Sequence, residues 1–446
     1  AQQIVLMSSP TLNLDQTTVD NFDVPLEQNL PFLFQANASP LTLGTSGSNK
    51  TLVLTLTPKV PGATNADGSP GLGLTGDALQ VYPKAVQAVL LDPQLGSALA
   101  TGVINTPTAQ SVFSQFSPDV SGGSRAVAIM ITDQSTGPVA ARQRLLRDYA
   151  GQEGELTLWT QEYAGSINNK GEQDANGALT AYKDHGFGFA LGMDSGSAKD
   201  GWYGGALSFY SGDITETAPR DSRTEAEWYM LTGYSDWRGK HLFLDTQATL
   251  GYGSLTGKRD LVTPTLTRQA LSKRAGLLGA LGATTGAVFQ YGSFSVTPHF
   301  SLDALTMREE GYTENSGGDG LDLAVAPYYA NSLRAFFGTD VAENINLGDF
   351  SLKPEGRLGY RYDFLADPVK LKAGFAAVGA STNTDPLGAT NSFTLIGPDP
   401  DKGDVVGGLS INALADSWSV GLNYDWIRGS HGSTSQVATF SLLGRI

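Results

Sequence analysis

The chain contains no cysteine among its 446 residues. This absence excludes disulfides, thiolate metal sites and a cysteine nucleophile, and it suits an oxidising compartment such as a cell envelope. Charged residues are also scarce, at 16 %, against roughly 25 % in ordinary soluble domains. The formal net charge is −15, and no arginine precedes Arg125. We therefore expect no nucleic-acid partner, because such binding needs clustered Lys and Arg.

Long apolar runs are missing as well. No stretch reaches the roughly 18 uninterrupted apolar residues of a transmembrane helix, so we predict none. The first residues, AQQIVLMSSP, lack the basic and apolar regions of a signal peptide. We expect either that a signal peptide was removed or that the chain is a piece of a longer protein.

The motifs of common active sites are absent too. The sequence has no GxSxG and no P-loop. The adjacent Glu309 and Glu310 would point to opposite faces of a strand, and we expect solvated loop charges there. The four histidines occur singly, without metal-site spacing: His185, His241, His299 and His431. We predict no catalytic residue, no metal and no cofactor.

Glycine, by contrast, is abundant, with 54 residues. The stretch HGFGFALGMDSG, residues 185–196, shows how it is used. Large apolar residues alternate there with very small ones, Gly188, Ala190 and Gly192. Such alternation predicts a strand with one apolar face and one nearly empty face.

Similar runs continue from residue 154 to the end and are separated by turn sequences. Strands of about ten residues with this alternation are typical of a transmembrane β-barrel. A closed antiparallel barrel whose two chain ends lie on the same side needs an even number of strands. We therefore predict twelve strands from thirteen candidates, and 369–380 is the candidate that we expect not to be a barrel strand. The thirteen candidates are 155–165, 185–194, 202–211, 225–237, 241–253, 270–289, 293–307, 331–342, 350–362, 369–380, 404–414, 418–428 and 434–446.

Aromatic residues gather in the same region, since all six Trp and 14 of the 16 Tyr follow residue 154. We expect aromatic girdles at both bilayer interfaces. A soluble β-sandwich or solenoid with ordinary core aromatics is the alternative. The absence of helices between the strands argues against it.

The first third of the chain has a different character. Residues 41–60 contain two short strand-like runs around a polar turn, and residues 76–117 have helical patterns, with Asp77 as an expected N-cap. A further helical segment is predicted to break near Gly137-Pro138. Its second half carries three arginines, Arg142, Arg144 and Arg147. A basic helix in an acidic protein suggests that acidic side chains surround it.

Several segments, in order along the chain, resemble the autotransporters, the type V secretion proteins of Gram-negative bacteria. FSQFSPDVSGGSRAVAIMITDQ (113–134) is similar to the family's segment between passenger and pore helix. GFGFALGMD, GWYGGALSFYSG, YMLTGYSDWRGKHLFLDTQATLGYG, SVTPHFSLDALTMREEGYTE, SLRAFFGTDV and SLKPEGRLGYRYDF follow the family's barrel in order. Residues 41–60 look like the last turns of a β-helical passenger.

The resemblance implies an all-β transmembrane fold: a twelve-stranded antiparallel outer-membrane barrel with an α-helix in its lumen, preceded by a short β-helix-like and helical extracellular segment. The implied domains are the end of a β-helical passenger (1–75), a helical junction (76–118), a linker and pore helix (119–153) and the barrel (154–446). Gly188, Ala190 and Gly192 would face the lumen and leave room for the helix.

The implied function is to export and anchor the chain's own N-terminal passenger at the surface of a Gram-negative cell. The implied partners are outer-membrane lipid, the barrel-assembly machinery, the passenger and, as further candidates, other surface proteins. Arg142, Arg144 and Arg147 would pair with lumenal carboxylates and lock the plug. A structural plugged-barrel scaffold, an enzyme whose catalytic domain lies upstream of residue 1 and a diffusive porin are the alternatives.

Two details concern assembly and cleavage. Phe440, Leu442 and Ile446 share one face of the last strand, which we expect the assembly machinery to recognise, although the family usually ends in an aromatic residue. Some members cut themselves between two Asn of the pore helix. No Asn occurs between Asp119 and Gln152, and Asn168-Asn169 is expected in an exposed loop, so we predict no cleavage of that type.

Overall fold

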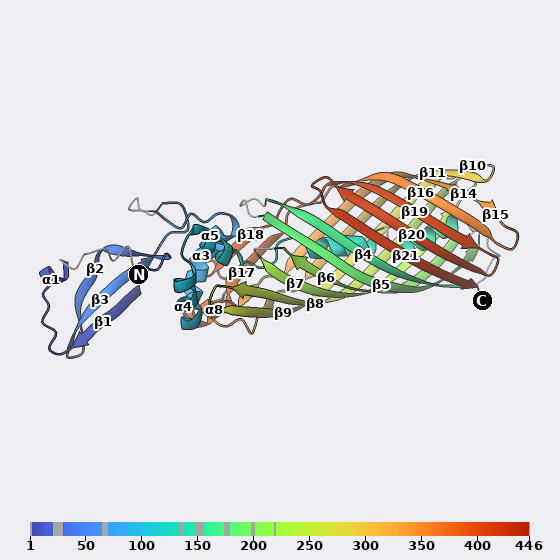
Figure 1. Ribbon diagram of the computed structural model, residues 1–446. Helices are drawn as coiled ribbons and strands as arrows, with labels where there is room; N and C mark the ends of the chain where they lie inside the picture. The colour runs from blue at the N-terminus through green and yellow to red at the C-terminus, as the bar shows by residue number, and fades with distance from the viewer. Residues whose placement is uncertain are drawn as a thin grey trace.

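A computed structural model describes residues 2–20, 30–64, 70–133, 137–148, 156–173, 179–197, 201–217 and 220–445. The molecule is elongated, with a small N-terminal sheet, a cap and a long barrel following one another along its axis (Figure 1). The C-terminus lies at the end of the barrel far from the cap. Within the described residues, no helix is long and apolar enough to cross a membrane.

Twelve long antiparallel strands form the barrel, as the sequence predicts. β4 pairs with β21, and β9 with β11, so the sheet closes on itself. Closure satisfies the backbone polar groups around the whole circumference. The strands are β4 (Thr157–Gln173), β5 (Leu179–Ser197), β6 (Gly201–Glu216), β7 (Asp221–Arg238), β8 (Leu242–Val262), β9 (Thr267–Ala287), β11 (Phe294–Glu309), β14 (Tyr328–Glu343), β16 (Ser351–Asp363), β19 (Gly403–Leu414), β20 (Trp418–Gly429) and β21 (Thr434–Arg445).

Alternation along each strand separates an apolar outer wall from a lumen lined largely by polar residues and rings. In β5, for example, Phe187 and Leu191 are exposed, whereas Asp184 and Asp194 are buried inside. Short hairpin additions extend the far end of the wall, namely β10 (Phe289–Tyr291) and β15 (Ile345–Asn346).

The cap is built jointly by the N-terminal helices and by two long insertions between barrel strands. One apolar core joins the two parts and includes Phe113, Phe116, Phe375 and Leu395. Its sheet has the order β12-β13-β17-β18. Its elements are α3 (Gly76–Val89), α4 (Pro93–Gly102), α5 (Thr106–Ser114), β12 (Tyr312–Thr313), β13 (Leu323–Val325), β17 (Lys370–Phe375), α8 (Ala376–Thr382) and β18 (Ser392–Ile396).

Candidate 369–380 is thus not a barrel strand, in line with the predicted count of twelve. Leu371, Ala373 and Phe375 alternate because their side chains enter the core of the cap. Alternation identifies a half-buried strand but not the sheet to which it belongs. Asp77 is not an N-cap, because α3 begins after Thr75; the Asp77 carboxylate instead accepts a hydrogen bond from Arg220 at 2.7 Å.

The N-terminal sheet consists of β1 (Gln2–Ser9), β2 (Phe34–Ser46) and β3 (Asn49–Pro58), with the short α1 (Gln16–Asp20) beside it. Both pairings are antiparallel. This differs from the expected β-helix-like segment, whose coils pair in parallel. Gly47, with φ at +61°, and Ser48 reverse the chain between β2 and β3, and a two-residue turn can join only antiparallel strands.

Other placements also differ from expectation. Only three Trp residues lie on the outer wall; Trp159, Trp202 and Trp228 are buried in the lumen. Asn168 and Asn169 belong to β4, which extends further than the predicted 155–165. Glu309 is not a solvated loop residue, because it ends β11 and pairs with Arg274 at 2.5 Å, while Glu310 is exposed.

Candidate functional site: the plugged lumen

Two consecutive helices, α6 (Gly123–Thr132) and α7 (Pro138–Asp148), lie inside the barrel and lead from the cap towards β4. The predicted break near Gly137-Pro138 is observed, since α7 begins at Pro138. Proline is tolerated there because the first helical position needs no backbone N–H partner. The chain therefore passes through its own barrel.

The apolar side of each helix packs against the aromatic inner wall. Val127 and Ile131 of α6 share a cluster with Tyr163 and Tyr210. Val139 and Leu146 of α7 share another, whose wall residues are Trp159, Ala190, Trp202, Ala206, Tyr234 and Leu443. Apolar side chains of both helices thus fill part of the lumen.

Arg142 of α7 makes a deeply buried ion pair. Its Nε and Nη2 donate to the two carboxylate oxygens of Asp194 at 2.7 and 2.6 Å. The Asp194 carboxylate also accepts from the Tyr234 hydroxyl at 2.7 Å, and that hydroxyl accepts from Trp159 Nε1 at 2.7 Å. A bidentate guanidinium–carboxylate pair of this kind fixes orientation as well as distance.

Arg147 reaches the other side of the barrel. Its guanidinium contacts Asp245 at 2.8 Å and Asp340 at 3.4 Å, and it lies over the ring of Phe243. Arg144 is buried and lines a small polar cavity together with Asp340 and Glu355. All three predicted arginines therefore lie inside the lumen next to carboxylates.

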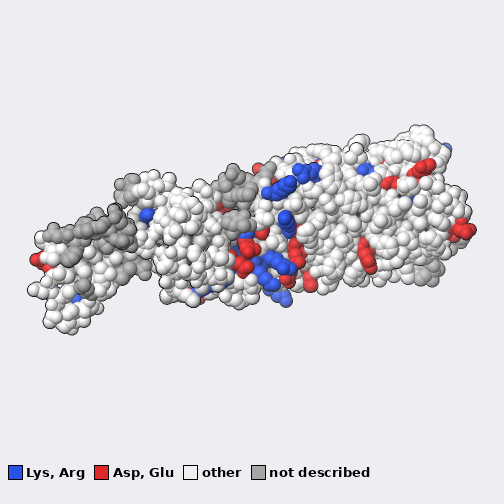
Figure 2. Space-filling model, viewed as in Figure 1, with Lys and Arg blue, Asp and Glu red and all other residues white. Residues whose placement is uncertain are grey.

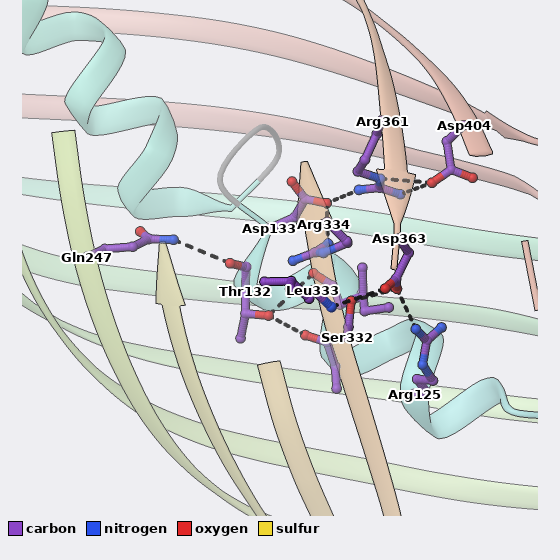
Figure 3. A network of polar contacts seen from close by, with 12 residues as sticks. Arg125, Thr132, Asp133, Gln247, Ser332, Leu333, Arg334, Arg361, Asp363 and Asp404 are labelled. Carbon is purple, nitrogen blue, oxygen red and sulfur yellow. Dashed lines mark hydrogen bonds and ion pairs between the residues drawn. The ribbon is translucent and has the colours of Figure 1, made fainter. Parts of the chain in front are cut away.

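A second set of polar contacts holds α6, near the cap (Figure 3). The residues that make these contacts were not predicted from the sequence. Arg125 pairs with Asp363 at 2.5 Å. Asp133, just after α6, pairs with Arg361 and, at 2.7 Å, with Arg334. Its carboxylate lies at the negative end of the α6 dipole, and the two arginines offset that repulsion.

A sequence signal for these residues did exist. Arg125 is the first arginine of the chain, and Asp133 is the only acidic residue between Asp119 and Asp148. Their partners come from β14 and β16, some 200 positions away in the sequence. Nothing local in the sequence indicates which strand would face α6.

The three small residues of β5 are buried on the lumenal side of the strand, and Ala190 packs against the plug, within the α7 cluster. A Cβ atom on Gly188 would meet the Tyr163 ring and a backbone carbonyl. One on Gly192 would meet the indole of Trp159. The missing side chains thus leave room for rings of the neighbouring strand rather than for the helix itself.

The last strand presents Phe440 and Leu442 on its outer face. Ile446, the third residue of the predicted assembly signal, lies outside the described residues. The histidines remain dispersed, and no group of three or more His, Asp or Glu in the described part of the chain is placed to hold a metal ion.

A closed barrel with an apolar outer wall and a lumen filled by its own chain defines a plugged outer-membrane β-barrel. Residues 159–425, more than half of the chain, match the family model described as the autotransporter beta-domain. The chain belongs to the autotransporter family, whose β-domains are outer-membrane translocators that export a passenger to the surface of Gram-negative bacteria.

A solved structure has the same fold. The translocator domain of the autotransporter NalP from Neisseria meningitidis is 12 % identical, with a TM-score of 0.53, over 73 % of this chain and 97 % of that one. The beta domain of the Bordetella autotransporter BrkA is 17 % identical over 64 % of this chain and 98 % of that one, with a TM-score of 0.44. No curated protein sequence matches this chain.

Proposed function

We propose that the folded chain is the exported and anchored state of the translocator. The observation that carries this proposal is the path of the chain: the cap and N-terminal sheet lie at one end of the barrel, and α6 and α7 connect them through the lumen to β4. A segment outside the barrel that is linked through the pore cannot leave without cleavage. The barrel thus acts as the membrane anchor of whatever it has exported.

The ion pairs give the anchor its lock. Arg142 and Arg147 link α7 to β5, β8 and β14, while Arg125 and Asp133 link α6 to β14 and β16. The cap covers one end of the barrel from outside. It is held there by an apolar core that the N-terminal helices share with the insertions between barrel strands. Both closures oppose return of the chain and leakage of solutes.

The proposed state also defines the surroundings of the barrel. The apolar wall contacts outer-membrane lipid, and the N-terminal sheet and cap face the cell exterior. The barrel-assembly machinery recognises the final strand through its outer face, which includes Phe440 and Leu442, and at its end Ile446. The absence of an Asn pair from the pore helix supports continued attachment of the passenger.

The lack of native cysteine provides a clean test of orientation. Ser48 is exposed in the turn between β2 and β3, and Lys240 is exposed in the turn between β7 and β8 at the opposite end. We expect S48C to react with a membrane-impermeant maleimide on intact cells, because the proposal places Ser48 outside. K240C should react only after the outer membrane is permeabilised.

The wild-type chain provides the blank for this labelling, and labelling of both variants after lysis confirms that each thiol is reactive. Protection of S48C on intact cells, or labelling of K240C on intact cells, would refute the proposed orientation.

A further inference from the structure

Side chains on the outer wall of β5 to β8 form rows that run across the strands, perpendicular to them. Pairing places Phe189, Phe209, Tyr229 and Tyr252 side by side across the four strands. The rings of Phe189 and Phe209 are 5.6 Å apart, and those of Phe209 and Tyr229 are 5.1 Å apart. Aromatic residues on a barrel wall mark the boundary between hydrocarbon and polar headgroups.

A leucine row follows on the side away from the cap. The same pairing aligns Leu191, Leu207, Leu231 and Leu250. The leucine and aromatic rows together line a shallow apolar hollow in the outer wall. The hollow spans four strands, and three spacings of about 4.8 Å make it about 14 Å wide, enough for several acyl chains side by side.

A basic row crosses the same strands six residues closer to the cap. Lys183 pairs with Thr215, Thr215 with Arg223, and Arg223 with Lys258 across the strands. Lys273 of β9 lies diagonally beside Lys258, opposite Thr256. In Figure 2, charged side chains gather at this end of the barrel, while most of the visible wall beyond is uncharged.

Nearby carboxylates do not neutralise the row completely. Asp213 pairs with Arg223 at 2.8 Å, and Glu225 with Lys258 at 3.3 Å, in exposed contacts. Lys183 and Lys273 have no ion-pair partner among the residues that the structure describes. Arg223 and Lys258 are direct cross-strand neighbours that share Glu225, at 3.8 and 3.3 Å respectively, so the uncompensated charge of the row lies at its two ends, on Lys183 and Lys273.

We propose that the outer wall of β5 to β8 binds a phosphorylated, multiply acylated glycolipid of the outer leaflet, of the lipid A type. The phosphates bind the basic row (Lys183, Arg223, Lys258 and Lys273), and the acyl chains lie in the hollow formed by the aromatic and leucine rows. The cations are spread across several strands, which fits a headgroup with more than one phosphate better than a single phosphate.

The vertical spacing also favours a large headgroup. Six residues correspond to about 20 Å along a strand. A strand tilt of about 35–45° reduces this to roughly 15 Å of height. A sugar headgroup can occupy this height between the phosphates and the chains. The direction of the lipid rests on the proposed orientation, with the cap outside, which the cysteine labelling tests separately.

The test measures lipid binding to the full chain in a neutral detergent by native mass spectrometry. The probes are diphosphorylated hexa-acyl lipid A, the same lipid without phosphates, and phosphatidylglycerol. We expect the phosphorylated lipid A to bind at least tenfold more tightly than either other lipid. R223Q/K258Q should weaken its binding roughly 30-fold, because each cation near a membrane surface contributes several-fold to affinity.

K370Q/K372Q is the matched control, because it removes two exposed charges from β17 in the cap. It should bind lipid A as the wild type does, and a folded-barrel band on unheated gels verifies each variant. Equal binding of the dephosphorylated lipid or of phosphatidylglycerol would overturn the proposal. So would wild-type affinity in R223Q/K258Q, or an equal loss in the control.

Discussion

Replacing Arg142 by alanine is expected to lower the free energy of unfolding of the plugged barrel by about 3–5 kcal/mol, because it leaves a buried carboxylate without its cation. The side chains of Arg142 and Asp194 are only 2 % and 0 % exposed, respectively. Without the guanidinium, the Asp194 carboxylate keeps a single side-chain hydrogen bond, from Tyr234. Denaturant unfolding in detergent micelles, followed by the conversion of the folded to the unfolded band on unheated gels, measures the change.

Two variants make this result specific. R142A/D194A removes both charges, so it should recover much of the loss seen in R142A. R223A breaks an exposed pair on the outer wall and should cost less than about 1 kcal/mol. An R142A barrel that unfolds at the wild-type denaturant concentration would contradict a structural role for this pair.

Replacing Gly192 by valine is expected to destabilise the barrel by about 1–3 kcal/mol or more, the usual cost of adding atoms to a filled interior. The new side chain would overlap the indole of Trp159. Displacing that ring also breaks its hydrogen bond to Tyr234, the residue that supports Asp194. The same denaturant measurement should therefore show a lower free energy of unfolding, because both the Trp159 packing and the support of the Arg142–Asp194 pair are weakened.

Gly233 of β7 provides the matched control. A Cβ atom there meets nothing within 4 Å, so G233V should change the free energy of unfolding by less than about 0.5 kcal/mol. If G192V unfolds at the same denaturant concentration as G233V and the wild type, then the position of the Trp159 ring does not require a glycine at position 192.

Much of the barrel could be predicted from the sequence, because the period of two and the turn residues are local signals. The alternation alone predicted a nearly empty face at Gly188, Ala190 and Gly192, and the resemblance to the autotransporters implied that this face lines the lumen. The interrupted helix followed from Gly137-Pro138, and its basic character from three arginines. These properties depend on neighbours within a few residues along the chain.

The parts that escaped prediction depend on distant contacts. The partners of Arg125 and Asp133 come from strands joined to α6 only by tertiary packing. Trp159 and Trp228 were expected at the bilayer interface, but glycines on neighbouring strands provide lumenal spaces that accept their rings. Likewise, β17 has the alternation of a barrel strand, yet its apolar face is covered by helices of the cap.

The most direct test of the central claim, that the chain's own helices close the pore, is the single-channel conductance of the full chain in planar bilayers. We expect near-zero conductance for the wild type. We expect large, stable openings for R142A/R144A/R147A, because the replacement releases α7 from the wall. Wild-type conductance and wild-type thermal stability in the triple variant would contradict the claim.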